Sequence, residues 1–184
     1  MTILFCNVGW MERYQGLRSG DHISGGGAYV DKEGHGHEVC NFSSDKAALY
    51  GYVQTPGTQI NIDRMGASND AHYIDGVTVV WTALRPGGGT VIVGWYRDAT
   101  VFRDYQEFKK VPTAQSQNDL NGYWIKAPFE KATLLTVDSR VFQIPRGVKG
   151  GIGISNVWYA NRPESASLVK KVLALNKEIG RAHV

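Results

Sequence analysis

Residues 95–98, Trp-Tyr-Arg-Asp, place two large aromatic rings and a pair of opposite charges in consecutive positions. A flat aromatic surface beside a positive charge suits a planar, electron-rich ligand such as a nucleobase. Residues 90–93 are β-branched and follow a glycine turn at 87–89, which predicts a strand leading into this segment. Gly94 interrupts the strand, as glycine does at a bulge or where another group approaches the backbone. The simpler alternative is that both rings are ordinary sheet residues.

Aromatic and amide side chains recur at expected strand ends and turns elsewhere in the chain. They are Trp10, Tyr29, Asn41, Trp81, Trp95, Tyr96, Trp124, Asn156, Trp158 and Tyr159, with Arg97, Arg103, Arg146 and Lys149 as basic neighbours in sequence. A pocket for an extruded base needs aromatic walls, amides that read the base edge, and cations that hold phosphates. We expect about half of the rings to be core residues, Trp81 among them because it lies inside a predicted strand.

The sequence therefore predicts a base-binding pocket with named roles. We expect Trp95 and Tyr96 to form its walls, and Trp10 and Trp158 are the next candidates for this role. Asn41 and Asp98 are the candidate readers of the base edge, and Arg97 and Arg103 are the candidate phosphate contacts.

Two other patterns invite a chemical interpretation, and both have a simpler one. His35, His37, Glu38 and Cys40 are residue types that bind zinc, but no second Cys/His pair follows, which favours an exposed glycine-flanked turn. Residues 21–23, Asp-His-Ile, match the start of an HNH nuclease motif, without its later Asn and His at a usable spacing. No phosphate-binding glycine loop or Gly-x-Ser-x-Gly elbow is present. We expect no catalytic residue, metal site or cofactor in this fragment.

Length and composition restrict the protein class. The 184 residues suit one domain, and 42% hydrophobic residues can build a core. A net charge of +3 excludes a polycationic nucleic-acid coat but permits a local basic groove. We expect no membrane span, since no run of 18 apolar residues occurs. Without a signal sequence, Cys6 and Cys40 are expected to be reduced thiols of a cytoplasmic protein.

Frequent turn signals separate short β-branched or alternating segments along most of the chain. The predicted strands are Ile3–Val8, Leu49–Gln54, Gln59–Asp63, Val77–Leu84, Thr90–Tyr96, Thr100–Arg103, Tyr123–Lys126 and Leu134–Val137. Val77–Leu84 and Thr90–Tyr96 should pair as an antiparallel hairpin across residues 85–89. The pattern predicts a mainly β, α+β fold: a curved antiparallel sheet or a β-barrel with a few peripheral helices and a C-terminal helix.

The predicted helix is Glu164–Glu178, capped by Asn161 and with Pro163 in its first turn. Residues 179–184, Ile-Gly-Arg-Ala-His-Val, fit this helix poorly and equal the translation of ATC GGA AGA GCA CAC GTC, a reading frame of a common sequencing adapter. We therefore predict a recognition domain over 1–162, a helix or linker over 163–178 that leads to a missing domain, and an adapter artefact over 179–184.

Several segments together carry a resemblance to a known family. They are 3–11 (Ile-Leu-Phe-Cys-Asn-Val-Gly-Trp-Met), 25–30, 36–42, 50–53, 60–64, 91–103 and 155–160, in this order. Their order resembles the N-terminal region of bacterial HNH-endonuclease-like proteins of the modification-dependent restriction type. The resemblance implies a DNA-reading module with the nuclease downstream, and a small barrel related to the PUA, EVE and SRA groups. The catalytic motif itself is absent from these residues.

The prediction from the sequence is thus a recognition module that binds duplex DNA and accepts a modified, flipped base. Two alternatives stay open. A small-molecule enzyme would use Asp98 or His37 in a pocket. A protein-interaction or structural domain would keep its aromatic rings in the core.

Overall fold

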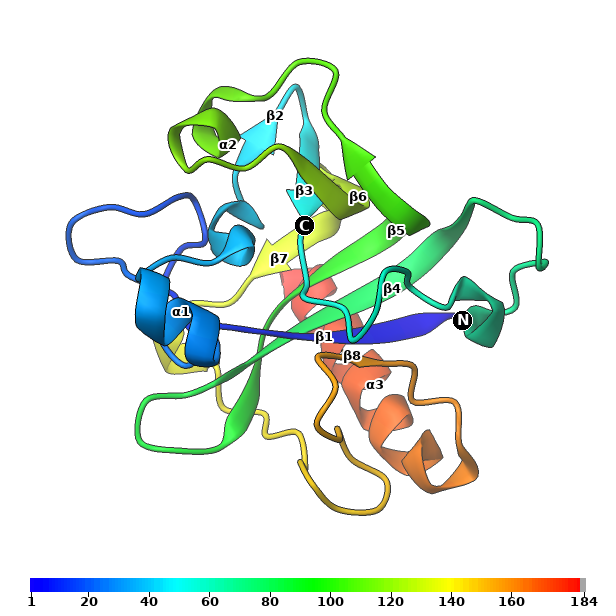
Figure 1. Cartoon of the computed structure of the whole chain (residues 1–184). Helices are drawn as coiled ribbons and strands as arrows, with labels where there is room; N and C mark the ends of the chain where they lie inside the picture. The colour runs from blue at the N-terminus through cyan, green and yellow to red at the C-terminus, as the bar shows by residue number, and fades with distance from the viewer. Residues whose placement is uncertain (183–184) are drawn as a thin grey trace.

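The computed structural model describes residues 1–182, and over this range the fold is α+β and mainly β (Figure 1). A mostly antiparallel, eight-stranded sheet has the order β2-β3-β6-β5-β4-β1-β8, with β7 paired to β5. Its strands are β1 Ile3–Val8, β2 Ser44–Asp45, β3 Ala48–Gly51, β4 Tyr73–Leu84, β5 Thr90–Glu107, β6 Gly122–Pro128, β7 Ala132–Leu134 and β8 Val157–Trp158. Because β2 and β8 stand at opposite ends of this order, the sheet is the open, curved one of the two predicted forms.

Three α-helices and several 3-10 turns connect or cover the strands within the described range. The helices are α1 Ala28–Glu33, α2 Thr113–Gln117 and α3 Ala166–Ala182, and the 3-10 turns are η1 His37–Cys40, η2 Ile62–Met65, η3 Phe129–Lys131, η4 Val137–Ser139 and η5 Pro163–Ser165. No helix between residues 1 and 182 combines the length and the hydropathy that a membrane span requires.

The hairpin of β4 and β5 is the centre of the sheet, and its prediction is confirmed. Leu84 pairs with Thr90 across the 85–89 connector, and the two predicted strands around residues 90–103 form one continuous β5. Gly94 is required by a close approach: a Cβ placed there would lie 2.5 Å from the Thr133 carbonyl oxygen of the neighbouring β7. The sequence expectation of a bulge or close contact at this glycine is therefore confirmed, and a register shift lies opposite it between Trp81 and Thr82.

The two faces of the sheet carry separate hydrophobic cores because successive strand residues point to opposite sides. Along β1, Ile3 and Phe5 belong to the core under α3, whereas Leu4 and Cys6 belong to the other core. The core under α3 is closed by one helix, whose Val172 is completely buried. The other core lies beneath α1, η1, η2 and the loop segments.

Helix α3 packs on the core beneath it through apolar residues that include Leu168, Val172 and Leu175, but its start and end differ from the predicted ones. Pro163 opens the 3-10 turn η5, and Asn161 does not cap it; its side chain instead bonds to Arg64. The α-helix continues past Glu178, and Ile179 packs against the core under α3. Residues 179–182 therefore do fit a helix, and positions 183–184 of the predicted artefact lie outside the described residues.

The predicted strand Gln59–Asp63 is wrong, although its burial pattern is right. Ile60 and Ile62 are buried as an alternating strand would bury them. Residues 59–61 instead form no regular element, with the Ile60 N–H donating to the Arg103 carbonyl, and Ile62 and Asp63 begin the 3-10 turn η2. Residues 113–117, in the connection between β5 and β6, form α2, and the predicted strand at Leu134–Val137 is shifted to β7 Ala132–Leu134.

Candidate functional site

The best candidate site is a cleft of about 490 Å³ where β1 and β4 end. These two strands pair in parallel, with Val8 opposite Ala83, so their carboxyl ends meet at one edge of the sheet. We call this cavity the amide cleft, after the side chains that line it: Asn7, Glu38, Gln54, Leu84, Arg146 and Asn156, with backbone from residues 25–27.

Asn7 and Asn156 form the amide part of the cleft and are held in place by the sheet. The Asn7 N–H donates to the Asn156 carbonyl at 2.8 Å, just before β8 pairs with β1. The Asn7 side-chain Nδ2 lies 3.5 Å from Asn156 Oδ1, and the Thr82 hydroxyl donates to Asn7 Oδ1 at 3.2 Å. Because Asn7 is only 8% exposed, these contacts satisfy a polar group that would be costly to bury alone. Both amides are therefore pre-oriented.

Glu38 supplies the carboxylate of the cleft from the turn η1. Its Oε1 accepts the Gly9 backbone N–H at 3.1 Å, which joins η1 to the end of β1. Gly36 leaves room for the other oxygen, since a Cβ there would lie 2.6 Å from Glu38 Oε2. A carboxylate fixed in this way offers acceptors to ligand N–H groups.

A smaller cavity of about 160 Å³ adjoins the amide cleft, and we call it the side chamber. Glu38, Gln54 and Gly26 line both cavities, while His37 and Tyr52 line the side chamber alone. The His37 and Tyr52 rings lie 4.8 Å apart between centroids, at 30°. Burial lowers the pKa of His37, partly offset by the Glu38 carboxylate, so the imidazole is held toward its neutral form.

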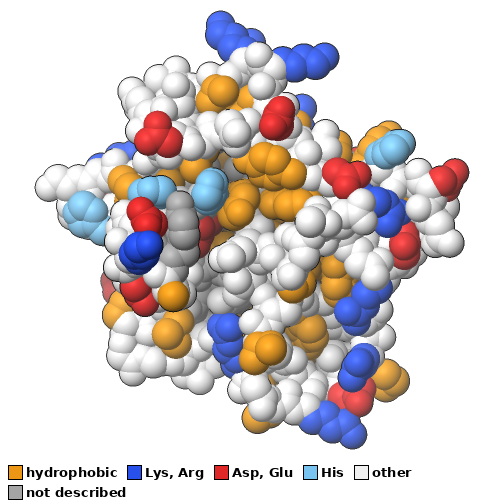
Figure 2. Space-filling model, in the orientation of Figure 1, with side chains coloured by type: hydrophobic (Ala, Val, Ile, Leu, Met, Phe, Trp, Pro, Cys, Tyr) orange, Lys and Arg blue, Asp and Glu red, His pale blue; other side chains and the backbone are white. Residues whose placement is uncertain are grey.

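A third cavity of about 400 Å³, which we call the basic groove, is lined by the loop that precedes β8. Arg64, Lys149 and Arg162 line it, and so does Trp158. The Arg64 guanidinium stacks 4.4 Å from the centroid of Tyr159, and Lys149 lies 3.8 Å from a Glu164 oxygen. This groove is lined by three cations and by the Glu164 carboxylate, and on the face drawn in Figure 2 Lys and Arg side chains lie among Asp and Glu side chains.

The predicted walls Trp95 and Tyr96 are wrong, because both side chains are completely buried. They also lie in different cores: Trp95 packs under α3, and Tyr96 packs on the opposite face beside Trp81 and Phe42. The Tyr96 hydroxyl donates to the Asn41 carbonyl, and burial raises its pKa well above the ordinary value. Neither ring can stack on a ligand.

Asn41 is also a structural residue and not an edge reader. Its Nδ2 donates to the Tyr52 carbonyl at 3.0 Å, and its Oδ1 accepts the Tyr52 N–H at 2.8 Å. These two bonds pair Asn41 with Tyr52 as a neighbouring strand would, just beyond the end of β3. The Asn41 side chain is 1% exposed, so it is not available to a ligand. Trp10 is half-buried, with the Arg140 guanidinium 4.8 Å from its ring centroid. It too lies outside the amide cleft.

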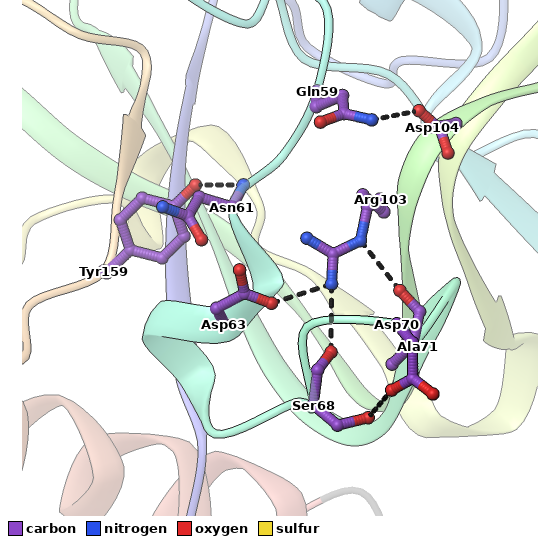
Figure 3. Close-up of polar contacts among 9 residues, drawn as sticks. All are labelled: Gln59, Asn61, Asp63, Ser68, Asp70, Ala71, Arg103, Asp104 and Tyr159. Carbon is purple, nitrogen blue, oxygen red and sulfur yellow. Dashed lines mark hydrogen bonds and ion pairs between the residues drawn. The ribbon is translucent and has the colours of Figure 1, made fainter.

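The predicted phosphate contacts are held by the protein itself. Arg103 donates to the Asp63 carboxylate and to the carbonyls of Ser68 and Ala71, so it clamps the 59–72 segment onto β5 (Figure 3). Asp63 correspondingly raises the pKa of Arg103. Arg97 donates to the Lys131 carbonyl at 3.2 Å. Exposed Asp98 lies 4.0 Å from the Lys131 ammonium and lines none of the three cavities.

Of the predicted base-binding residues, only Trp158 borders one of these cavities. It is half-buried, lines the basic groove and packs against Phe5, with ring centroids 4.8 Å apart. The set is otherwise scattered over both faces of the sheet.

The nuclease-like and zinc-like patterns have structural explanations. Buried Asp21 accepts the backbone N–H groups of Glu12 and Arg13 at 2.7 and 2.9 Å, which stabilises the turn after β1. Cys40 is buried and donates to the Ala114 carbonyl at 3.6 Å. Over residues 1–182, no three His, Cys, Asp or Glu side chains gather in a group that could hold a metal ion.

Sequence reasoning missed Asn7 and Gln54 and gave Glu38 a different role. A usable signal was present at Asn7, a polar residue inside the apolar run of β1. A buried polar side chain must find partners and often lies beside a site. For Gln54, an exposed residue in a loop, no comparable signal exists.

No protein-family model, curated protein or solved structure matches the chain. The resemblance to HNH-endonuclease-like proteins therefore stays a prediction. The site has to be interpreted from its own geometry: two oriented amides, a fixed carboxylate and a nearby cationic groove.

Proposed function

We propose that the chain is a DNA-binding recognition module that takes an extruded, modified base into the amide cleft. The observation that carries this proposal is the lining of the cleft by Asn7, Glu38, Gln54 and Asn156, all of which present hydrogen-bonding groups. The pocket is thus moved from the predicted aromatic segment to the edge where β1 and β4 end.

The size and polarity of the cleft suit a nucleobase. Ligand pockets of this kind measure roughly 300–1,000 Å³ and hold a few placed polar groups, and the amide cleft has about 490 Å³. Flipped bases are read through hydrogen bonds to their Watson–Crick edge. Carboxylate oxygens of Glu38 would accept N–H groups of the base, whereas the amides would pair with either donors or acceptors.

The side chamber supplies a place for the modification. It opens beside Glu38 and Gln54, so a base held by these residues would direct a substituent toward His37 and Tyr52. Arg146, exposed at the cleft, and the cations of the basic groove would contact the flanking phosphates.

A binding titration tests the proposal. The probes are short duplexes of one sequence that carry cytosine, 5-methylcytosine, 5-hydroxymethylcytosine or N6-methyladenine at the centre. At least one modified duplex should bind about tenfold more tightly than its unmodified counterpart. Equal binding of all duplexes, or binding of none, would remove the proposal.

Glu38→Gln is the matched variant for this experiment. Glutamine keeps an oxygen that can accept the Gly9 N–H, so the fold should persist. The variant loses the charge and replaces one acceptor with a donor, and affinity for the preferred duplex should fall about tenfold. Glu130→Gln, an exposed substitution on η3, removes the same charge away from the cavities and should bind as the wild type does.

An enzyme that acts on a small molecule is the second candidate, and the position of His37 favours it. A neutral imidazole beside a carboxylate can serve as a general base when both reach a substrate, and His37 and Glu38 line the same chamber. Incubation of the protein with nucleosides of the same modified bases, followed by mass spectrometry, separates the two. Conversion of a nucleoside would support the enzyme. If all nucleosides stay unchanged, only the recognition function remains.

A further inference from the structure

The loop between Arg146 and Asn156 contributes residues to both the amide cleft and the basic groove. Arg146 and Asn156, at its two ends, line the cleft, while Lys149, Ile154 and Ser155 within it line the groove. We call residues 146–156 the divider loop. A duplex that delivered a base to the cleft and phosphates to the groove would therefore contact residues of this loop in both places.

The divider loop is built as a fixed projection. Ile152 is 1% exposed and anchors it in the core under α3, and the Ile152 N–H donates to the Pro145 carbonyl at 2.8 Å. The Gly147 N–H donates to the Ile152 carbonyl at 2.7 Å, which closes the loop. The Ser155 hydroxyl contacts both the N–H and the carbonyl of Val157 and so fixes the exit into β8.

Ile154 lies in the segment between the closed part of this loop and β8, and it is 99% exposed. Single exposed apolar residues are common on protein surfaces and by themselves indicate nothing. Ile154 differs in its setting, since it lies two residues from Asn156 in the cleft and shares the groove with Arg64 and Lys149. A large apolar side chain between a base-sized cavity and a cluster of cations matches what a duplex-opening wedge requires.

We infer that Ile154 enters the base stack and fills the space left by the base that moves into the amide cleft. Proteins that distort a duplex use apolar wedges of this type, because the inserted side chain replaces part of the lost stacking. Arg146 on one side and Lys149 with Arg162 on the other hold the phosphates that flank the opened step. This inference rests on the proposed function, and it adds the element that opens the duplex.

Fluorescence of 2-aminopurine tests the wedge directly. The probe is a short duplex of the preferred sequence with 2-aminopurine next to the target base, where unstacking raises its emission. Wild-type protein should increase the emission, and Ile154→Ala should lose most of that increase while Ile154→Leu retains it. Val141→Ala is the matched control, because Val141 is 69% exposed and lines neither cavity.

Affinity measurements separate the wedge from the cleft. Ile154→Ala should weaken binding to the paired duplex about tenfold and leave binding to the same strand as a single strand unchanged, because a single strand needs no opening. A full emission increase with Ile154→Ala overturns the wedge. The protein could bind the modified single strand preferentially and cause no emission change in the duplex. This result would overturn the wedge and leave the proposed function standing. Absence of binding to both strands and duplexes overturns both.

Discussion

His37 gives the side chamber a pH-sensitive wall. Desolvation lowers its pKa from the ordinary value of 6.5, so the folded protein binds this proton more weakly than the unfolded chain does. The stability that neutral His37 contributes is fully present above pH 6.5 and declines as the pH falls toward the lowered pKa.

Comparison with His37→Asn isolates this effect. We expect the unfolding free energy of the wild type to fall more steeply than that of the variant between about pH 6.5 and pH 5. Urea unfolding at several pH values measures both slopes. Parallel curves for the two proteins would show that His37 titrates equally in the folded and unfolded states.

Trp95 is a stability residue, and its substitution should show this. The side chain is completely buried beneath α3, and Trp→Ala substitutions at such positions cost about 3–5 kcal/mol through lost contacts and a residual cavity. Urea unfolding of Trp95→Ala should show a loss of this size, with unchanged DNA affinity for the folded fraction. The control is Ile154→Ala, which should remain within about 0.5 kcal/mol of the wild type. A lower DNA affinity of the folded Trp95→Ala protein would instead show that Trp95 takes part in DNA binding.

The position of Trp95 and Tyr96 could have been derived from the sequence by one further step. Adjacent residues of a strand point to opposite faces of the sheet, so two consecutive rings cannot line one pocket unless a bulge intervenes. None of the three register shifts in this hairpin falls between the two residues, since Trp95 pairs with Val80 and Tyr96 with Val79, so the rings stay on different faces. The residue types are suited to stacking on a base, but the alternation of side chains along the strand prevents the two rings from lining one pocket.

At the scale of elements, the turn after β1 is held from two sides. Asp21 accepts two backbone N–H groups from this turn, and buried Arg140 reaches it from beyond β7. Arg140 donates to the carbonyls of Leu135, Met11 and Glu12 at 3.0, 2.6 and 2.6 Å. This turn directly follows Gly9, to which Glu38 is bonded, so Arg140 supports the cleft from a distance.

Arg140→Met should therefore destabilise the protein strongly. The substitution leaves three carbonyls without their donor, and each unsatisfied buried group costs roughly 1–3 kcal/mol, so we expect a loss of about 3–5 kcal/mol. Arg13→Met, in the same turn but exposed, should cost about 0.5 kcal/mol or less. Urea unfolding of both variants provides the comparison, and equal losses would contradict the role assigned to Arg140.

Elements with a local pattern were predictable from the sequence, and those fixed by distant contacts were not. The β4–β5 hairpin follows from β-branched runs on either side of a glycine turn, and β1 begins and ends where its apolar run does. The segment around Ile60 and Ile62 has the same alternation as a strand, but its backbone partner is Arg103 and Ile62 begins a 3-10 turn. The alternation of apolar and polar residues correctly predicts that Ile60 and Ile62 are buried. The backbone conformation depends on the contact with Arg103, which the local sequence does not reveal.

At the scale of the whole molecule, the amide cleft depends on a pairing that no local pattern reveals. Paired residues of β1 and β4 lie about 75 positions apart in the sequence, and the two strands run in parallel, so their ends meet beside Glu38 and Asn156. Hydrophobic patterns place each strand in a sheet but do not specify its neighbours. The residues of the cleft come from eight separate segments, and this explains why sequence analysis recovered some of their types but not their grouping.

The distribution of charge over the molecule predicts a moderate dependence of DNA binding on salt. The net charge is +3, and the cations that flank the divider loop are Arg64, Arg146, Lys149 and Arg162. About four phosphate contacts give a slope of about −3 to −4 for log affinity against log salt, or a fall of about 100-fold between about 50 and 200 mM. Fluorescence anisotropy at several salt concentrations measures the slope.

Two variants connect this slope to particular contacts. Arg146→Gln and Lys149→Gln should each make the slope shallower by about one, because each removes one released counterion. An uncharged modified nucleoside should bind with the same affinity at every salt concentration, since it has no phosphate to contact. A slope near zero for the duplex would mean that the groove does not contact phosphates. A slope of about −6 or steeper would require a longer track of cations than the divider loop and its neighbours provide.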